Sequence, residues 1–213
     1  MKHRIFEGDK LVIASHNKGK IKEIRSVLEP LEINVLSAKE LNIIEPDENG
    51  SSFNENALIK STFVAKKSGF PSLSDDSGIC FPDLNNFPGI YSARWAGKSK
   101  DFNLAMMKVY HGLKSIKNPI KNCFFVCSLS LAWPDGYDVT VSGKVDGTFS
   151  WPPKGEKGFG YDPIFKPLGH NRTFAEMEPD FKHSISHRSF AFKKLIELCF
   201  PTINTLWKKR KTC

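Results

Sequence analysis

The spacing of apolar positions near the start of the chain predicts a strand followed by a helix. Residues 11–14, with the sequence LVIA, form a short apolar run typical of a buried strand. Pro30 closes the segment that follows. The apolar residues of that segment have the spacing of one helical face: Ile21, Ile24, Val27 and Leu28. A polar loop containing a glycine therefore joins the strand to the start of the helix.

Two further helices carry start signals. Ser52 and Glu55 form an S-x-x-E capping pattern at the start of one helix. Gly69 is the stop signal for the same helix. Asp101 is expected to cap a helix that reaches about His111. The expected buried face of the first helix consists of Ala57, Leu58, Ser61, Val64 and Ala65. Residues 34–51 are polar and are expected to be irregular.

The second half of the chain predicts a hairpin and a last helix. Residues 122–133 alternate as a long strand, a Pro-Asp-Gly turn follows, and residues 137–145 return as the partner strand. Thr173 and Glu176 repeat the capping signal. Residues 182–188 are expected to open the last helix. Its apolar stripe would consist of Ala191, Phe192, Leu195, Ile196, Leu198 and Cys199.

Two adjacent carboxylates, Asp75 and Asp76, lie between apolar segments in the stretch LSDDSGI at residues 73–79. Neighbouring carboxylates repel each other and are costly to remove from water. One interpretation is an Asx-type turn between two strands. The other is that the pair, at the end of a buried strand, holds a hard cation through its oxygens. The local pattern leaves both open.

Composition limits the classes of protein. A chain of 213 residues fits one large domain or one domain with two lobes. The longest apolar run near the N-terminus is too short for a signal peptide or a membrane span. Five cysteines without a C-x-x-C pair are expected to be reduced residues of a cytosolic protein, and zinc is not expected. The basic residues 208–211 are interpreted as a solvated tail within a terminal segment 208–213.

The net charge of +8 favours an anionic partner: nucleic acid, a membrane surface or a small polyanion such as a nucleotide. Apart from the tail, the basic residues are dispersed, which disfavours a nucleic-acid stripe. The loop at residues 15–20 precedes a helix start, where free N–H groups and the helix dipole favour an anion; it is not a Walker A loop. An ordinary cap with surface lysines is the alternative.

Residues near the C-terminus add two signals for a ligand. The glycines and aromatic rings of residues 155–165 would let the backbone approach a flat ligand, although a tight turn with packed rings is the alternative. Lys182, His183, His187 and Arg188 gather at an expected helix start, where positive charge opposes the dipole unless an anion is bound.

Six collinear motifs resemble one known family. They are S-x-N-x-x-K at residues 15–20, ENA at 55–57, DDSG at 75–78, PG-x-YSAR at 88–94, GFGYDP at 158–163 and ISHR at 185–188. Together they resemble the HAM1/RdgB-type non-canonical purine nucleoside triphosphate pyrophosphatases (inosine triphosphatases), from residue 11 to about 195. Asn86 stands where a glycine is common in that family, just before Phe87 and the PG motif, so the shape of that loop is left open.

The resemblance implies an α/β fold: an elongated mixed sheet flanked by helices, with the substrate cleft between two lobes of a single domain, residues 1–213. It implies hydrolysis of ITP, dITP and XTP to the monophosphate and pyrophosphate with Mg²⁺, in the cytoplasm, by a homodimer. No membrane partner and no stable nucleic-acid partner are expected. The preference among the three nucleotides and the dimer interface stay open.

The resemblance also implies roles for residues. Asp76 would be the catalytic carboxylate and a ligand of Mg²⁺, with Asp75 in support. Glu48 would be the second metal carboxylate, although Asp47 is an alternative because that loop varies in length. Substrate would be bound by Ser15, His16, Asn17, Lys18, Gly19, Lys20, Ser77, Phe159, Gly160, Tyr161, Asp162, Lys182, His187 and Arg188.

Two rival functions are weighed against this one. A Maf-like pyrophosphatase acting on dTTP or UTP would share the reaction, but the motifs at residues 159–162 and 186–188 argue against it. A basic nucleic-acid-binding module without catalysis would show steep salt dependence of binding. The dispersed lysines and the Asp75-Asp76 pair argue against that module.

Overall fold

The computed structural model describes residues 3–29 and 33–200, so the tail predicted at residues 208–213 lies outside the described residues. Within these ranges one six-stranded sheet has the order β2-β1-β3-β4-β5-β6. Its strands are β1 (Lys10–Ile13), β2 (Asn34–Ser37), β3 (Ser72–Cys80), β4 (Asn122–Ala132), β5 (Asp138–Phe149) and β6 (Phe165–Pro167). β1 runs parallel to β2 and β3, whereas β5 and β6 are antiparallel, so the fold is α/β with a mixed sheet, as predicted.

Helices flank this sheet. The α-helices are α1 (Lys18–Leu28), α2 (Phe53–Ser68), α3 (Ser92–Trp95), α4 (Phe102–Lys114), α5 (Pro179–Ser184) and α6 (His187–Cys199). Short 3₁₀ helices span Pro82–Leu84, Gly89–Tyr91, Asp162–Ile164 and Phe174–Glu176. In the part of the chain that the structure describes, no helix is both long enough and apolar enough to cross a membrane.

The chain contacts divide the molecule into two compact units. Unit 1 comprises Met1–Asp76, Ser128–Ser142 and Ala191–Cys213, of which only the described residues are discussed. Unit 2 comprises Ser77–Cys127 and Gly143–Phe190. β3, β4 and β5 contribute residues to both units, and the boundary in β3 falls between two consecutive residues, Asp76 and Ser77.

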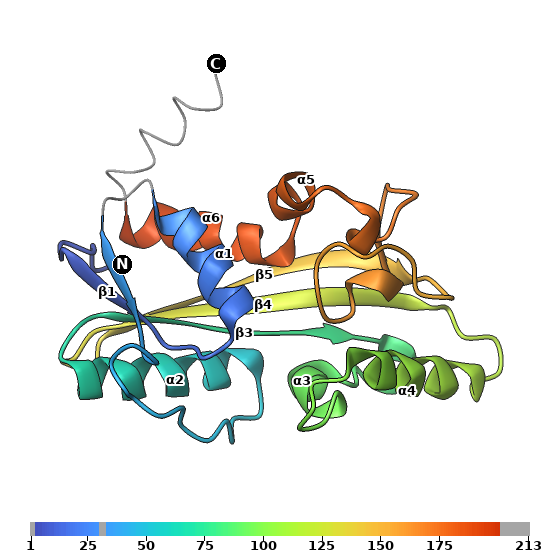
Figure 1. The fold of residues 1–213 in the computed structure, drawn as a ribbon, viewed down its shortest axis with the longest axis horizontal. Coiled ribbons are helices and arrows are strands. Elements are labelled where there is room, and N and C mark those ends of the chain that lie inside the picture. The colour runs from blue at the N-terminus through green and yellow to red at the C-terminus, as the bar shows by residue number, and fades with distance from the viewer. Residues whose placement is uncertain (1–2, 30–32, 201–213) are drawn as a thin grey trace, which may run out of the picture. The chain divides into compact units, whose positions relative to one another are not determined.

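In unit 1, α2 lies on one face of the strands, and α1 and α6 lie on the opposite face (Figure 1). Small residues bring α2 close to the strands: Ser61 Oγ donates to Ser130 Oγ at 2.8 Å and Ser74 Oγ donates to the carbonyl of Ala57 at 2.5 Å. Hydroxyl bonds therefore fix the position of this helix along the sheet.

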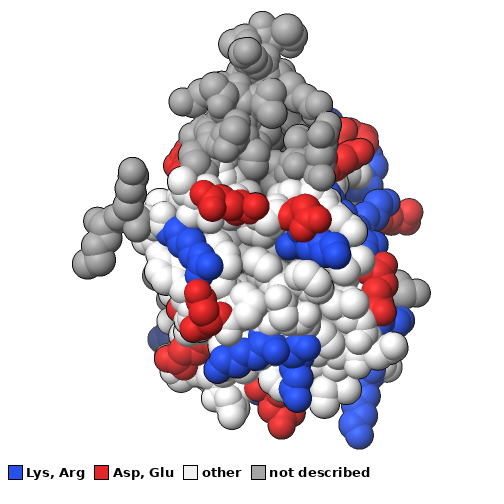
Figure 2. All heavy atoms as spheres, turned by 90° about the vertical axis from the view of Figure 1, so that its left-hand side faces the viewer, with Lys and Arg blue, Asp and Glu red and all other residues white. Residues whose placement is uncertain are grey.

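On the face shown in Figure 2, acidic and basic side chains of the described residues are interspersed and form no single basic patch.

The core of unit 2 is rich in aromatic rings. Phe125 packs against Phe165 at 4.7 Å between ring centroids, and Phe165 packs against Phe174 at 4.9 Å. α4 contributes Ala105, Met106, Val109 and Leu113 to the same core. Such tilted and edge-on packing excludes water from one side of the segments that carry the predicted binding residues.

Several predicted elements are confirmed. β1 and α1 occupy the predicted positions, Ser52 and Gly69 cap α2, and Asp101 caps α4. β4 and β5 follow each other through a short turn at residues 133–137, as the hairpin prediction requires. Of the five cysteines, the four within the described residues (Cys80, Cys123, Cys127 and Cys199) are free and buried, as expected.

Other predictions were wrong. β2 forms within the segment expected to be irregular, and β3 runs without interruption through Asp75 and Asp76, so the turn interpretation fails. Lys182 and His183 lie in α5, so the last helix begins only at His187. The buried face of α2 contains Asn56 and Lys60 in place of Leu58. In contrast, the predicted Thr173–Glu176 capping box is confirmed, and it heads a 3₁₀ turn.

Replacing Gly155 with alanine should strongly destabilise the protein. Gly155 has φ +84° and an added Cβ would lie 2.3 Å from the carbonyl carbon and oxygen of Ala175. Backbone strain and overlap should together lower the free energy of unfolding by about 3 kcal/mol or more. Gly136→Ala is the matched control, since Gly136 has φ +94° but nothing within 4 Å of its Cβ position.

Urea unfolding of both variants measures the difference. The control should lose only the conformational part, about 1 kcal/mol. Equal losses of unfolding free energy in the two variants would show that the Cβ added at position 155 does not overlap the carbonyl of Ala175.

Candidate active site

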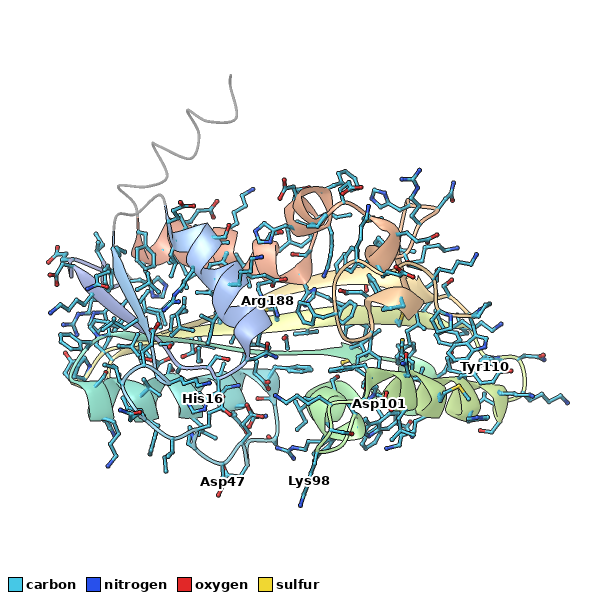
Figure 3. The ribbon with its side chains drawn as sticks, viewed as in Figure 1. His16, Asp47, Lys98, Asp101, Tyr110 and Arg188 are labelled. Atoms are coloured by element: carbon cyan, nitrogen blue, oxygen red, sulfur yellow. The ribbon has the colours of Figure 1, made fainter. Side chains whose placement is uncertain are left out.

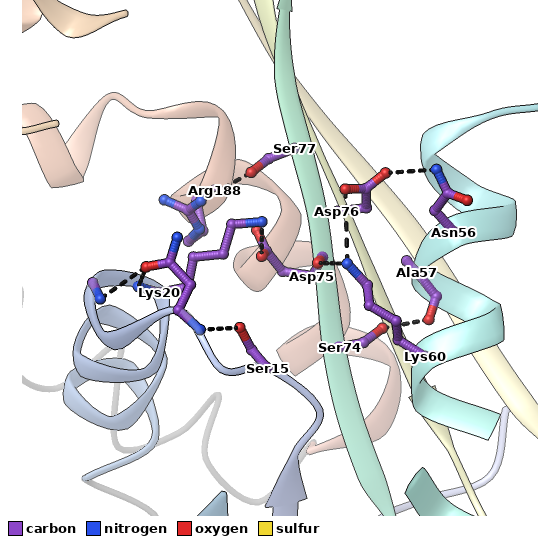
Figure 4. A network of polar contacts seen from close by, with 12 residues as sticks. Ser15, Lys20, Asn56, Ala57, Lys60, Ser74, Asp75, Asp76, Ser77 and Arg188 are labelled. Carbon is purple, nitrogen blue, oxygen red and sulfur yellow. Dashed lines mark hydrogen bonds and ion pairs between the residues drawn. The ribbon is translucent and has the colours of Figure 1, made fainter. Parts of the chain in front are cut away.

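Asp75 and Asp76 are buried in the middle of β3, and the two residues are only 1% and 6% exposed. Successive side chains of a strand point to opposite faces of the sheet. Figure 4 shows Asp75 on the side of α1 and Asp76 on the side of α2. The two carboxylates therefore have separate surroundings, although they are consecutive in the sequence.

A lysine of α1 neutralises Asp75. Lys20 Nζ lies 2.5 Å from Asp75 Oδ1, and both side chains are largely buried. Lys20 comes from the first turn of α1, which follows the loop at residues 15–20. The lysine that the sequence assigns to substrate binding is thus held by a carboxylate of the predicted site.

A lysine of α2 joins two other carboxylates. Lys60 Nζ is 2.5 Å from Glu48 Oε1 and 3.7 Å from Asp76 Oδ1, and it also donates to the carbonyl of Asp75 at 2.8 Å. Burial lowers the pKa of Lys60, but Asp76, Glu48 and Asp75 outweigh it, so the pKa is raised and the side chain stays charged.

Asn56, one turn before Lys60 on α2, holds the other oxygen of Asp76. Its Nδ2 donates to Asp76 Oδ2 at 3.2 Å, and its Oδ1 accepts from the N–H of Gly50 at 2.9 Å. The amide therefore links Asp76 to the loop that carries Glu48. Burial raises the pKa of Asp76 to about 6, although Lys60 and Lys20 act against this shift.

The loop before α1 is organised around Asn17. Its Oδ1 accepts from the N–H groups of Gly19 and Lys20 at 2.9 and 3.2 Å, and Ser15 Oγ accepts from its own N–H at 3.1 Å. The N–H groups of Gly19 and Lys20, which the sequence predicts to face an anion, thus donate to the side chain of the N-cap residue Asn17. The N–H of His16 donates to Glu45 at 2.7 Å. The side chain of Lys18, also predicted to bind substrate, lies outside the described residues.

The donor set around Lys60 fits a divalent cation. Glu48 and Asp76, with the carbonyl of Asp75, turn oxygens toward one ammonium group. Hard cations such as Mg²⁺ take one or two carboxylates from the protein and the rest from water and phosphates. In contrast, Asp47 is exposed, and its side chain points out of the loop in Figure 3.

In unit 2, Asp162 organises the second group of predicted residues. Its Oδ2 accepts from the N–H of Phe159 at 2.8 Å and from Lys182 Nζ at 2.6 Å. Lys182 Nζ also lies 5.0 Å from the centre of the Phe159 ring, which is 41% exposed. Gly158 permits this arrangement, because a Cβ there would lie 2.3 Å from Asp162 Oδ2.

The remaining predicted residues of unit 2 lie near its core. Arg188 is buried and its Nη2 donates to Ser77 Oγ at 3.2 Å (Figure 4). The ring of His187 stacks on Phe125, with centroids 4.7 Å apart. Tyr161 is a core residue whose hydroxyl donates to the carbonyl of Ser92 at 3.0 Å, and burial raises its pKa.

The structure thus forms two clusters of predicted residues, one in each unit. In unit 1 it brings Lys20 to Asp75 and Glu48 to the neighbourhood of Asp76. In unit 2 it brings Phe159 and Lys182 to Asp162. Sequence reasoning missed Asn56 and Lys60. The available signal was their spacing, i and i+4, on the helix face that also carries Ala57 and Ser61.

Known proteins are similar to this chain in sequence and in fold. A dITP/XTP pyrophosphatase of Zymomonas mobilis is 50% identical over 199 residues, which cover 93% of this chain and 95% of that protein. A HAM1 protein from Coxiella burnetii has a TM-score of 0.82 and 37% identity, over 87% of this chain and 95% of that one. A dITP/XTP pyrophosphatase from Mycobacterium abscessus has a TM-score of 0.74 and 37% identity, over 88% and 98%. Residues 11–198 match the model of the Ham1 family, and the chain belongs to that family, as its six motifs predict.

Proposed function

We propose that this chain hydrolyses non-canonical purine nucleoside triphosphates, dITP, ITP and XTP, to the monophosphate and pyrophosphate. Relatives that match almost the whole chain are named dITP/XTP pyrophosphatases. The observation that carries the proposal is the buried Asp76, which is held by Asn56 and Lys60 beside the carboxylate of Glu48. A carboxylate kept charged against its burial is suited to proton transfer and to metal binding.

We assign to Asp76 the orientation of the attacking water and the acceptance of its proton. Water attacks the α-phosphorus, the bond to the bridging oxygen breaks, and pyrophosphate leaves with the electron pair. Lys60 favours the ionised form of Asp76, and Asn56 holds the second oxygen so that the first can face the water. Lys20, already beside Asp75, supplies positive charge for phosphoryl oxygens.

Mg²⁺ is proposed as the cofactor, with Glu48 and Asp76 as its protein ligands. When bound, it would neutralise charge that develops on the phosphates. Glu48 is preferred to Asp47 because only Glu48 shares an ion pair with the group around Asp76. The ammonium group of Lys60 would then contact the substrate phosphates in addition to the carboxylates.

The base is assigned to the cluster of unit 2. Phe159 offers an exposed ring for stacking, and the ammonium of Lys182 beside it is a donor for a 6-keto oxygen. Hypoxanthine and xanthine carry that acceptor, whereas adenine presents an amino group and would leave the donor unpaired. Ser77, His187 and Arg188 are proposed to complete the binding of substrate.

We also propose that the enzyme is a cytoplasmic homodimer. Phe87 and Tyr91 stack with centroids 6.0 Å apart while remaining 45% and 38% exposed, and Leu104 and Met107 of unit 2 are exposed as well. Apolar surface of this kind is suited to burial against a second copy. The free, buried cysteines fit a reducing compartment.

A nucleotide panel tests the reaction. Pyrophosphate release should be fast with dITP, ITP and XTP and much slower with GTP and dTTP, and removal of Mg²⁺ by a chelator should abolish it. A preference for dTTP would favour the Maf-like alternative. Absence of pyrophosphate release from every nucleotide would contradict the proposal.

Asp76→Asn should lower kcat by about 100-fold or more, the usual worth of a positioned base. The variant should remain folded, because burial raises the pKa of Asp76 and the ionised carboxylate is therefore costly at neutral pH. Asp135→Asn, at an exposed carboxylate paired with Arg4, is the matched control and should keep wild-type turnover. Near-wild-type kcat in Asp76→Asn would remove Asp76 from the mechanism.

Glu48→Gln should raise the Mg²⁺ concentration needed for half-maximal activity by about tenfold or more. Asp47→Asn, at the neighbouring exposed position, should leave that concentration unchanged. Magnesium titrations of pyrophosphate release by both variants separate the two assignments. A larger increase of that concentration in Asp47→Asn than in Glu48→Gln would show that Asp47 is the metal ligand.

A further inference from the structure

A cavity in unit 2 is formed by residues that have no part in the proposed reaction. It has a volume of about 560 Å³, within the usual range for small-molecule sites. Its walls come from the end of α4, the connection to β4, the end of β5 and β6. Figure 3 places Tyr110, which lines it, on α4, away from the Asp101 end of that helix.

The charged residues that line this cavity are all basic: Lys114, Lys121 and Lys166. None of the three makes an ion pair with a carboxylate in the described part of the chain, in contrast to Lys20, Lys60 and Lys182. Three like charges around one concave space repel each other unless an anion is present. Their arrangement therefore favours a ligand with at least two negative charges.

The backbone holds one of these lysines firmly. Lys121 has φ +64°, a conformation that is unfavourable for a residue with a side chain. Its N–H donates to Asp83 Oδ2 at 2.8 Å, and its carbonyl accepts from the N–H of Phe149 at 2.8 Å. The two bonds fix the strained residue at the rim of the cavity.

Aromatic rings form the other wall. Tyr110 and Trp151 stack with ring centroids 4.4 Å apart and planes inclined by 14°. The Phe149 ring is nearly parallel to that of Trp151, with centroids 6.0 Å apart. Lys114 Nζ lies 5.8 Å from the centre of the Tyr110 ring. A flat ligand would find ring surface directly beside positive charge, which is the chemistry that nucleotide sites use.

We propose that this cavity binds a mononucleotide with two or more phosphates, at a site separate from Asp76. The phosphates would lie on Lys114, Lys121 and Lys166, and the base against the Tyr110–Trp151 pair. The volume suits one small ligand and not a nucleic-acid strand. This site does not depend on the proposed function, since no residue of the reaction contributes to it.

Lysine footprinting with ADP tests the site. ADP is a suitable probe because it cannot release pyrophosphate, so turnover does not interfere. The chain of 213 residues is treated with an amine-acylating reagent over an ADP titration, and each lysine is followed by mass spectrometry. At about four times Kd, mass action leaves one fifth of the sites empty, so acylation of Lys114, Lys121 and Lys166 should slow about fivefold.

Lys117 is the internal control, because it is exposed on the same connection but does not line the cavity. Its rate should not change. Equal slowing of Lys117 would indicate general shielding and overturn the proposal, as would unchanged rates of the three cavity lysines up to millimolar ADP. Protection by pyrophosphate at the same midpoint as ADP would overturn the role of the aromatic wall.

Variants give an independent measurement. Lys121→Gln and Lys166→Gln should each raise the ADP midpoint for the other two lysines by about tenfold, as expected for loss of one charged contact. Lys117→Gln should leave the midpoint unchanged. An unchanged midpoint in both cavity variants would show that these lysines do not hold the phosphates.

Discussion

The structure of unit 1 depends on two adjacent buried carboxylates that are neutralised from opposite faces of the sheet. Because β3 is continuous, Asp75 points toward α1 and Asp76 toward α2 (Figure 4). Each helix supplies one lysine, so neither carboxylate is left alone in an apolar environment, which would be costly. The helices on the two faces are thus required by the charges as well as by apolar burial.

This constraint explains the polar bonds of α2. A buried ion pair is useful only if its geometry is held, and Lys60 has a long, flexible side chain. The bonds from Ser61 to Ser130 and from Ser74 to the carbonyl of Ala57 fix the helix along the strands. Asn56 then adds a link between Asp76 and the Gly50 loop. Rigid hydroxyl contacts thereby place a mobile ammonium and an amide around one carboxylate.

Periodicity and caps predicted α1, α2, α4 and the β4–β5 hairpin because those signals are local. The same local signals misread β3, since Asp-Asp-Ser-Gly has the composition of a turn. This stretch is extended because β3 pairs with β1 and β4, and Lys20 and Lys60, from other parts of the sequence, neutralise its two carboxylates. Once the strand is known, its period of two separates the roles of Asp75 and Asp76. The family resemblance supplied Asp76 but gave no reason for the difference.

Burial divides the ion pairs of the described residues into two classes. Pairs such as Arg4–Asp135 and Lys144–Asp146 are about half exposed and contribute little to stability. Lys20–Asp75, Lys60–Asp76 and Lys182–Asp162 are buried, and all of them involve residues of the two predicted clusters. Buried pairs are seldom more stabilising than apolar residues of the same volume, so stability does not explain them. We propose that they serve a polyanionic substrate, for which each lysine would exchange part of its contact with a carboxylate for one with a phosphate or a base. The carboxylate that remains would then be the group that binds a metal or accepts a proton.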